Sequence, residues 1–483
     1  MNKIIFILPT QLFHNFALID SSDNSHIYLI EDHHHFQTYK YHKLKLIYHR
    51  ISMKIYFGFL SSKFKNVHYF DIKNHNGNVF STILKDIVQP TQIHMYDPIN
   101  NVILTSIEKA IKEHKHSVSI SLHLETSPYF LSTRNDLYQL YQVYQEKGTK
   151  LSHAEFYKFQ RKRLDILMPP KDGKWSYDTE NRQKFPKDST DVLDYEMWIK
   201  YNIKQYSDYI EEAQTYIDTY FPNNYGNHQN LLYPLTHKDA IKWLKEFIKN
   251  RLKHFGDYED AFDSNILFGY HSVLSPCMNI GLITSRDVIN EILKLNIKEY
   301  GMNNIEGFIR QIIGWREYSF YIYINYADEY LKMNYFNHHN KLDESYWTGT
   351  TGIIPFDNMV KKCLDYAYAH HIERLMISGN LFLLLGIEPK QILRWYNEIV
   401  AIDAYDVFMI PNIYGMSQYA DGGIMMKRPY FSSSNYILKM SHYKKSQVDG
   451  WGDLYVKFIK KQHNKLKHIY MISSQVKRIL SKK

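Results

Sequence analysis

The chain has 483 residues, a hydrophobic fraction of 44% and a formal net charge of +9. This length predicts two or three domains, and the hydrophobic fraction excludes a disordered chain. Because the sequence has no apolar run of about 18 residues and no signal-peptide pattern, we expect a soluble intracellular protein, of the cytoplasm or nucleus, with no membrane partner.

The residue types give little support to disulfide or metal chemistry. The chain has two cysteines, Cys277 and Cys363, too few for a disulfide framework or a Cys-x-x-Cys metal site. We expect both to be buried as small hydrophobic side chains. The run His33-His34-His35 has no second ligand cluster at metal-binding spacing, and its consecutive side chains diverge. We therefore expect no metal site.

The first 125 residues alternate short apolar segments with helical patterns, notably over 43–60. Strands separated by helices predict a parallel, Rossmann-like sheet of five strands with helices on both faces. Ligands of such sheets bind at the carboxyl ends of the strands, here near Pro9-Thr10-Gln11 and Glu31-Asp32. Neither a GxGxxG nor a GxxxxGKS/T loop occurs, so the usual modes of nucleotide binding are unsupported. The predicted strands are 3–8, 27–31, 67–71, 92–96 and 118–125.

The pattern changes after a polar, proline-containing stretch at 168–186, which we interpret as a linker or extended crossing segment. Beyond it, helical periodicity dominates and strand character is scarce. We therefore predict an α/β domain at 1–135, a linker with connecting helices at 136–235, and a large all-α domain at 236–483. The predicted helices of this second half are 238–254, 286–295, 305–326, 359–385 and 390–401.

The C-terminal tail is strongly basic. Residues 456–483 contain nine Lys or Arg and no Asp or Glu, so the tail alone equals the net charge of the chain. Lys457, Lys460, Lys461 and Lys465 fall at helical spacing on one side. Two interpretations stay open: a solvated helix face, or a stripe that contacts the phosphates of a nucleic acid.

The segment Tyr368-Ala-His-His-Ile-Glu-Arg-Leu-Met376 is the most informative in the chain. Histidines for proton transfer, an arginine with acidic residues downstream, and nearby aromatics are what a buried redox cofactor with a proton-coupled reaction needs. On spacing alone, the favoured interpretation of His370 and His371 is a pair of core histidines that bond neighbouring backbone groups.

Four segments together carry a specific family resemblance. They stand in the same order and spacing as in the photolyase–cryptochrome superfamily, and they most resemble its branch of prokaryotic (6-4) photolyases and iron–sulfur bacterial cryptochromes. This register favours a functional interpretation of the two histidines. The segments are 306–318 (EGFIRQIIGWREY), 368–376 (YAHHIERLM), 394–396 (RWY) and 411–423 (PNIYGMSQYADGG).

The resemblance implies an FAD held in the helical domain and, in the N-terminal domain, a lumazine-type antenna chromophore. By the family pattern, His371 faces the lesion as proton donor, with His370 and Gln311 as further catalytic candidates. Arg374 and Asp403 match an ion pair near the flavin ring. The aromatic electron relay is matched by Trp395, Tyr396 and Trp347. The remaining cofactor-binding candidates are Tyr258, His271, Ser272, Val273, Leu274, Ser275, Gln311, Arg316, Tyr405 and Met409.

Two departures from the branch stand out. Its 4Fe–4S cluster requires cysteine ligands, but three of the matching positions hold Pro355, Lys444 and Gln447, and no cysteine stands between 448 and 451. We therefore expect no cluster, with Tyr443 and Trp451 filling its space. Met409 stands where the superfamily places Asn, Asp or Glu beside the flavin N5 atom, and a thioether makes no strong hydrogen bond there.

The predicted function is light-dependent repair of UV-damaged DNA, most specifically of (6-4) photoproducts, by a monomeric FAD enzyme that flips the lesion out of the duplex. Two alternatives remain. The chain could be a cryptochrome-like flavin photoreceptor or regulator without repair activity, or a DNA-binding protein without flavin chemistry, because a shared fold does not fix function.

Overall fold

The structure is a computed structural model that describes residues 2–15, 18, 25–74, 77–115, 118–168, 173–177, 181–400 and 402–481. Part of the predicted linker at 168–186 lies outside these residues. The chain forms two compact units, each built from separate segments. The first contains Met1–Thr133, Tyr195–Lys245 and Leu274–Val288, and the second contains Arg134–Asp194, Glu246–Val273 and Ile289–Lys483. The linear domain boundaries at 135 and 235 remain a prediction.

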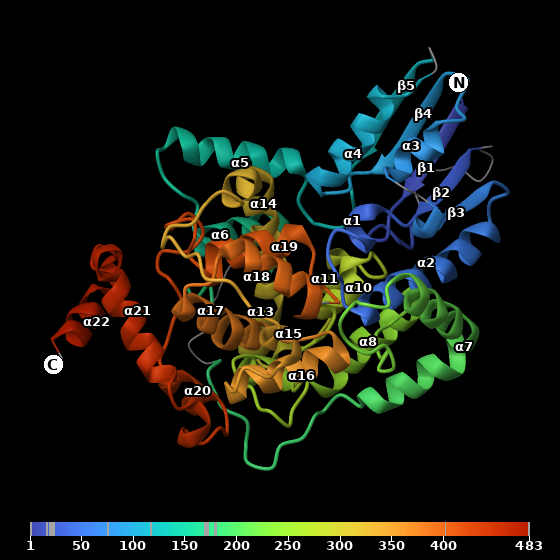
Figure 1. Cartoon of the computed structure of the whole chain (residues 1–483). Helices are drawn as coiled ribbons and strands as arrows, with labels where there is room; N and C mark the ends of the chain where they lie inside the picture. Colours follow the sequence, from blue (N-terminus) through green and yellow to red (C-terminus); the bar gives the residue numbers. More distant parts are fainter. Residues whose placement is uncertain are drawn as a thin grey trace. The chain divides into compact units, whose positions relative to one another are not determined.

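The first unit contains a five-stranded, fully parallel sheet with the order β3-β2-β1-β4-β5 (Figure 1), which confirms the predicted α/β class. The central strand β1 pairs on both sides, so that Ile4 lies opposite His26 of β2 and Ile93 of β4. The strands are β1 (Asn2–Ile7), β2 (His26–Ile30), β3 (Val67–Phe70), β4 (Thr91–Tyr96) and β5 (Ile120–Glu125).

Both faces of the central strand β1 are buried, which explains why it is apolar at every position from Ile4 to Ile7. Successive side chains of a strand point to opposite faces. Ile4 and Phe6 of β1 join a core with residues of α3 and α4, while the alternate residues Ile5 and Ile7 are equally buried on the other side. The helices with residues in this unit are α1 (His33–Phe36), α2 (Lys43–Ser61), α3 (Val79–Leu84), α4 (Asn101–Lys112), α7 (Tyr195–Tyr220), α8 (His237–Asn250), α10 (Ser275–Asn279) and α11 (Ser285–Leu293).

The carboxyl edge of this sheet, where we predicted a ligand, is tied together by its own side chains. The Gln11 side-chain amide donates to the carbonyl oxygen of Tyr96 at 2.8 Å and so links the ends of β1 and β4. Glu31, directly after β2, is fully buried and accepts hydrogen bonds from Tyr69 and Tyr216. These groups have structural partners within the unit.

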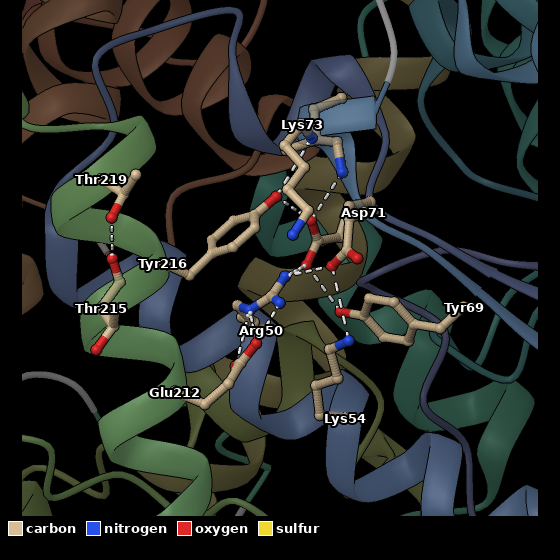
Figure 2. A network of polar contacts seen from close by, with 11 residues as sticks. Arg50, Lys54, Tyr69, Asp71, Lys73, Glu212, Thr215, Tyr216 and Thr219 are labelled. Carbon is tan, nitrogen blue, oxygen red and sulfur yellow. Dashed lines mark hydrogen bonds and ion pairs between the residues drawn. The ribbon is translucent and has the colours of Figure 1, made fainter.

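Arg50 of α2 is the centre of that network (Figure 2). Its guanidinium lies 2.7 Å from both Glu31 and Asp71, bonds Glu212 of α7, and stacks 3.5 Å from the Tyr216 ring centroid. The side chain is 2% exposed. One buried cation therefore joins two strand ends to two helices, and a buried charge of this kind is tolerated only while its partners remain.

The second unit is helical in its described residues, as predicted for the C-terminal half (Figure 1). Its regular helices are α5 (Arg134–Glu146), α6 (His153–Leu164), α9 (Leu252–Tyr258), α12 (Ile297–Tyr300), α13 (Met302–Ile309), α14 (Glu317–Tyr330), α15 (Ser345–Thr348), α16 (Ile354–Tyr366), α17 (Asn380–Leu385), α18 (Pro389–Trp395), α19 (Asp406–Ile410), α20 (Ser434–Met440), α21 (Trp451–Leu466) and α22 (Tyr470–Leu480). In the part of the chain that the structure describes, no helix combines the length and apolar character that crossing a membrane requires.

Two of the predicted helices are wrong as continuous elements. The predicted helix 359–385 breaks after α16, where Ala367 takes a left-handed conformation with φ 51° and ends the helix. The predicted helix 238–254 breaks between α8 and α9 at Arg251, whose φ is −122°. Neither residue type signals a helix end, because the break is imposed by the surrounding packing.

Candidate functional site

Four π-helical turns coincide with the segments that carry the family resemblance. Such turns are rare and are frequently found at functional sites. The first contains Gln311, Trp315 and Arg316, the second begins two residues after His371, and the third begins at Tyr396. No residue pattern announces a π turn, so sequence reasoning missed all four. They are Arg310–Arg316, Glu373–Gly379, Tyr396–Val400 and Pro411–Ser417.

The two adjacent histidines have opposite environments. His370 lies just outside the helical turn that begins at His371, and its backbone N–H donates to the Glu373 carboxylate at 3.1 Å. The His370 side chain is 4% exposed, whereas that of His371 is 50% exposed, with Nε2 3.8 Å from Asp260. Burial, with His271 and Lys362 nearby, lowers the pKa of His370 well below its ordinary value. His370 is therefore neutral, and His371 is the histidine that can exchange protons with an external group.

His271 lies against this pair. Its ring stacks on that of His370 with centroids 4.2 Å apart, and its two ring nitrogens face the carbonyl oxygens of Phe268 and Glu259 at 3.1 and 3.0 Å. Burial lowers the pKa of His271 to about 3. A neutral imidazole carries one N–H, so only one of the two carbonyl contacts can be a hydrogen bond.

The ring nitrogens of His271, His370 and His371 lie within 4.8 Å of one another, although we expected no metal site. Metal coordination requires ring lone pairs that converge on one point, and these lie in the ring plane. The rings of His271 and His370 are nearly parallel, at 17°, so their lone pairs do not converge. The arrangement does not favour a metal ion.

Glu259 is the functional candidate that sequence reasoning missed. This carboxylate, 4% exposed, accepts hydrogen bonds from Asn181, Arg310 and Gln311 at 3.2 to 3.3 Å. Burial raises its pKa to about 7, although Arg310 acts in the opposite direction. Its neighbour Asp260 faces His371, so two consecutive acids contact both the Gln311 helix and the histidine pair. The only sequence signal was the pair of acids within the predicted cofactor segment.

Arg374 and Asp403 form the predicted ion pair. Arg374 Nη2 lies 2.7 Å from Asp403 Oδ1, and Arg374 Nε donates to the carbonyl oxygen of Ala369 at 2.6 Å. The side chains are 18% and 7% exposed. A charge pair so shielded is sustained by mutual attraction. It joins the π turn Glu373–Gly379, which contains Arg374, to the segment that follows the π turn Tyr396–Val400.

Two of the three predicted relay aromatics are in ring contact, and the third, Trp347, is next in the chain to Tyr346, which Trp395 contacts. Trp395 and Tyr396 have ring centroids 5.2 Å apart. The Trp395 indole N–H donates to the carbonyl oxygen of Tyr346, and that of Trp347 donates to Glu398 at 2.8 Å. All three relay side chains are buried, so none meets solvent directly. Glu398 is a second acidic partner that the sequence pattern did not indicate.

The remaining predicted cofactor residues fall on several elements. Tyr258 and Ser272 are partly exposed and Val273 is buried, whereas the neighbouring Leu274 and Ser275 belong to the first unit. The Arg316 guanidinium lies 4.7 Å from the ring centroid of Phe408. Tyr405 and Met409, at 8% and 5% exposure, flank that ring in the chain. The structure thus brings Arg316 together with the segment that contains Tyr405 and Met409.

The positions of the expected cluster ligands lie on neighbouring elements. Helix α16, which contains Pro355, contacts the short helical turn Lys445–Val448 that contains Gln447. The Asn358 side chain donates to the Tyr443 hydroxyl at 3.1 Å across this contact. Trp451 is 2% exposed. Side chains thus join these elements directly.

Comparison with known proteins identifies the family of the chain. Residues 5–233 match the family model described as deoxyribodipyrimidine photo-lyase-related protein. The chain is 32% identical over 457 residues to a (6-4) photolyase of Agrobacterium fabrum, covering 92% of this chain and 86% of that protein. A Synechocystis cryptochrome shares the fold, with a TM-score of 0.57 at 14% identity over 96% of this chain and 89% of the other. An archaeal photolyase from Sulfolobus tokodaii does so too, with a TM-score of 0.54 at 16% identity over 98% and 93%. The chain therefore belongs to the deoxyribodipyrimidine photo-lyase-related family, within the photolyase–cryptochrome superfamily.

Proposed function

We propose that this protein repairs UV-damaged DNA in the light, with (6-4) photoproducts as its substrate and FAD as its cofactor. The observation that carries the proposal is the half-exposed His371 beside buried, neutral His370, within a chain that matches a (6-4) photolyase over most of its length. An accessible histidine, whose ordinary pKa lies near working pH, suits proton transfer to an extruded lesion.

The donor set of the site fits an FAD. A pyrophosphate needs hydrogen-bond donors, and a flavin ring needs a flat contact with polar groups at its edge. Ser272, Arg316 and Arg374 are partly exposed donors, and the solved Sulfolobus photolyase is described as holding two FAD molecules. Bound FAD would supply light-driven electron transfer. The residues proposed to hold it are Tyr258, His271, Ser272, Val273, Leu274, Ser275, Gln311, Arg316, Arg374, Asp403, Tyr405 and Met409.

In this proposal each nearby group has a separate task. His371 would donate the proton to the lesion, and His370 and His271 would position the His371 side chain from the buried side. The hydrogen bond from Gln311 to Glu259 would fix the orientation of the Gln311 side chain. Trp395, Tyr396 and Trp347 form the aromatic relay that renews the reduced cofactor. The 5.2 Å separation of Trp395 and Tyr396 supports that relay.

We further propose that the protein works as a monomer without an iron–sulfur cluster. A cluster of this type requires four thiolates, and the chain has two cysteines, Cys277 and Cys363, both buried. Tyr443 and Trp451 would then hold the elements that a cluster would otherwise join. A lumazine-type antenna in the first unit remains part of the proposal.

The alternative, a cryptochrome-like photoreceptor, is favoured by one residue. Met409 stands where the superfamily pattern has a hydrogen-bonding side chain beside the flavin, and a thioether is a weak acceptor with no proton to give. The Synechocystis cryptochrome shares the fold at a TM-score of 0.57. In this alternative the pocket binds flavin but light leads to signalling, and not to repair.

One experiment separates these functions. The purified protein is examined for bound flavin by absorption, and it is then illuminated with duplex oligonucleotides that contain a (6-4) or a cyclobutane lesion. Repair of the (6-4) duplex, lost in His371→Ala and retained in His33→Ala, supports the proposal, since His33 is an exposed histidine of the first unit that has no proposed contact with lesion, cofactor or DNA. Flavin without repair favours the photoreceptor, and a protein that binds no flavin refutes both.

A further inference from the structure

We propose that the C-terminal helix pair α21–α22 is a docking surface for the phosphate backbone of duplex DNA. The proposal rests on the proposed function only in its choice of DNA among polyanions. The residues proposed to contact the phosphates are exposed lysines: Lys457, Lys460, Lys461 and Lys467. No contact with a lesion or a cofactor is involved.

The geometry of α21 presents these lysines as one stripe. With 100° per residue, all four project within about 120° of the helix surface, and the first and last are about 15 Å apart along its axis. A duplex presents roughly nine phosphates over that length. Lys465, which we had predicted to share the stripe, does not, because its Nζ donates to the carbonyl oxygen of Tyr335 and the side chain is partly buried.

The opposite face of α21 is anchored, which holds the stripe in place. The Phe458 ring lies 5.4 Å from that of Phe336 and 5.1 Å from that of Phe431, measured between centroids. Gln462 donates to the carbonyl oxygen of Phe336 at 2.9 Å. A charged surface on a fixed element loses less side-chain and backbone freedom on binding than a free tail would.

The charges of the stripe are not neutralised locally. Asp453, one turn before Lys457 and on the same side of α21, is the last acidic residue of the sequence. None of the four lysines forms an ion pair with it or with another acid among the residues that the structure describes. Helix α22 adds exposed Lys477 and Arg478 to the same acid-free region. Counterions held by such a surface are exchanged for phosphates on binding, which gives DNA affinity without sequence preference.

A membrane surface fits the helix pair less well. An amphipathic helix binds lipid by burying an apolar face in it. The apolar residues Ile472 and Val476 of α22 are 2% and 1% exposed, so that face is already covered by protein. Tyr470, Met471 and Leu480 of α22 are exposed, but at 100° per residue they alternate with the basic residues of the helix and form no continuous apolar face. A charged surface without such a face favours a nucleic acid.

The test measures binding of undamaged duplex DNA in the dark, by fluorescence anisotropy over a salt series. The variant Lys457→Gln/Lys460→Gln/Lys461→Gln is compared with a control that removes the same charge elsewhere. The control lysines are equally exposed but each is already paired with a neighbouring acid: Lys109 with Glu113, Lys200 with Glu196 and Lys294 with Glu291, each changed to Gln.

We expect the slope of log affinity against log salt to become shallower by about 3 in the stripe variant, with affinity at least about tenfold weaker at low salt. The control should keep the wild-type slope, and thermal unfolding should confirm that both variants are folded. Equal slopes in wild type and stripe variant, or equal losses in both variants, overturn the proposal. A loss seen only with phosphatidylserine vesicles overturns it in favour of a membrane. The binding measurement needs neither light nor a lesion. Its outcome therefore does not depend on whether the protein repairs DNA.

Discussion

Glu259 gives the sharpest quantitative prediction, since its environment sets both the direction and the size of a pH effect. The pKa of this carboxyl is raised from 4.5 to about 7, by burial foremost. The native state therefore holds its proton more tightly than the unfolded chain does. Protonated Glu259 therefore contributes fully to the free energy of unfolding below about pH 4.5. This contribution decreases as the pH rises from 4.5 to 7, and it is absent at higher pH.

The interval between the two pKa values corresponds to about 3 kcal/mol. Glu259→Gln removes the cost of ionising a buried group, since an amide stays neutral, and Gln311 can rotate its own amide to keep the hydrogen bond. The stability of the variant relative to wild type should therefore rise by up to about 3 kcal/mol between pH 4.5 and pH 8.

The assay is chemical or thermal unfolding of both proteins across that pH range, with only the difference interpreted, because all other titrating groups cancel. Glu155→Gln is the matched control. Glu155 is exposed and its pKa is lowered by the hydrogen bonds from Ser152, so its difference should be small and of opposite sign. A relative stability of Glu259→Gln that does not change with pH would show that the carboxyl titrates as an ordinary one and would refute the reasoning.

Three further predictions follow from the same structure. Arg50→Met should destabilise the protein by about 3–5 kcal/mol, because it leaves Glu31 buried without its cation. The control Lys54→Met should cost less than about 1 kcal/mol, because the Lys54 side chain is 24% exposed and its Nζ lies 3.6 Å from Asp71. The two variants are compared by their unfolding midpoints in denaturant. Asp403→Asn should weaken flavin retention on gel filtration, since Arg374 would keep a shielded charge without its partner. Trp451→Ala should cost about 3–5 kcal/mol, while an iron chelator should leave the unfolding midpoint of the wild type unchanged; a shift with chelator would contradict the cluster-free proposal.

The sequence alone was sufficient for the fold class and the family. The central strand could be predicted because a strand buried on both faces is apolar at every position, as Ile4–Ile7 is. The segments ending at Phe70 and at Tyr96 could be predicted from their aromatic and β-branched residues, although they contain His68 and His94. Arg374 and Asp403, 29 positions apart, could be paired in advance only because the motif register of the family relates them; the structure places them 2.7 Å apart.

The tertiary structure decided the helix breaks, the exposure of side chains and their ionisation, because these depend on residues that are distant in the sequence. The break at Ala367 and the π turns arise from packing, because alanine has no intrinsic preference for a left-handed conformation. Buried His370 lies in the non-helical segment after this break, and half-exposed His371 begins the next helical turn. Glu259 became a candidate only when Asn181 and Arg310 closed around it, since burial, and not residue type, raises its pKa. Local periodicity determined which segments are strands and helices, but the ionisation and exposure of each side chain depend on neighbours that only the folded chain supplies.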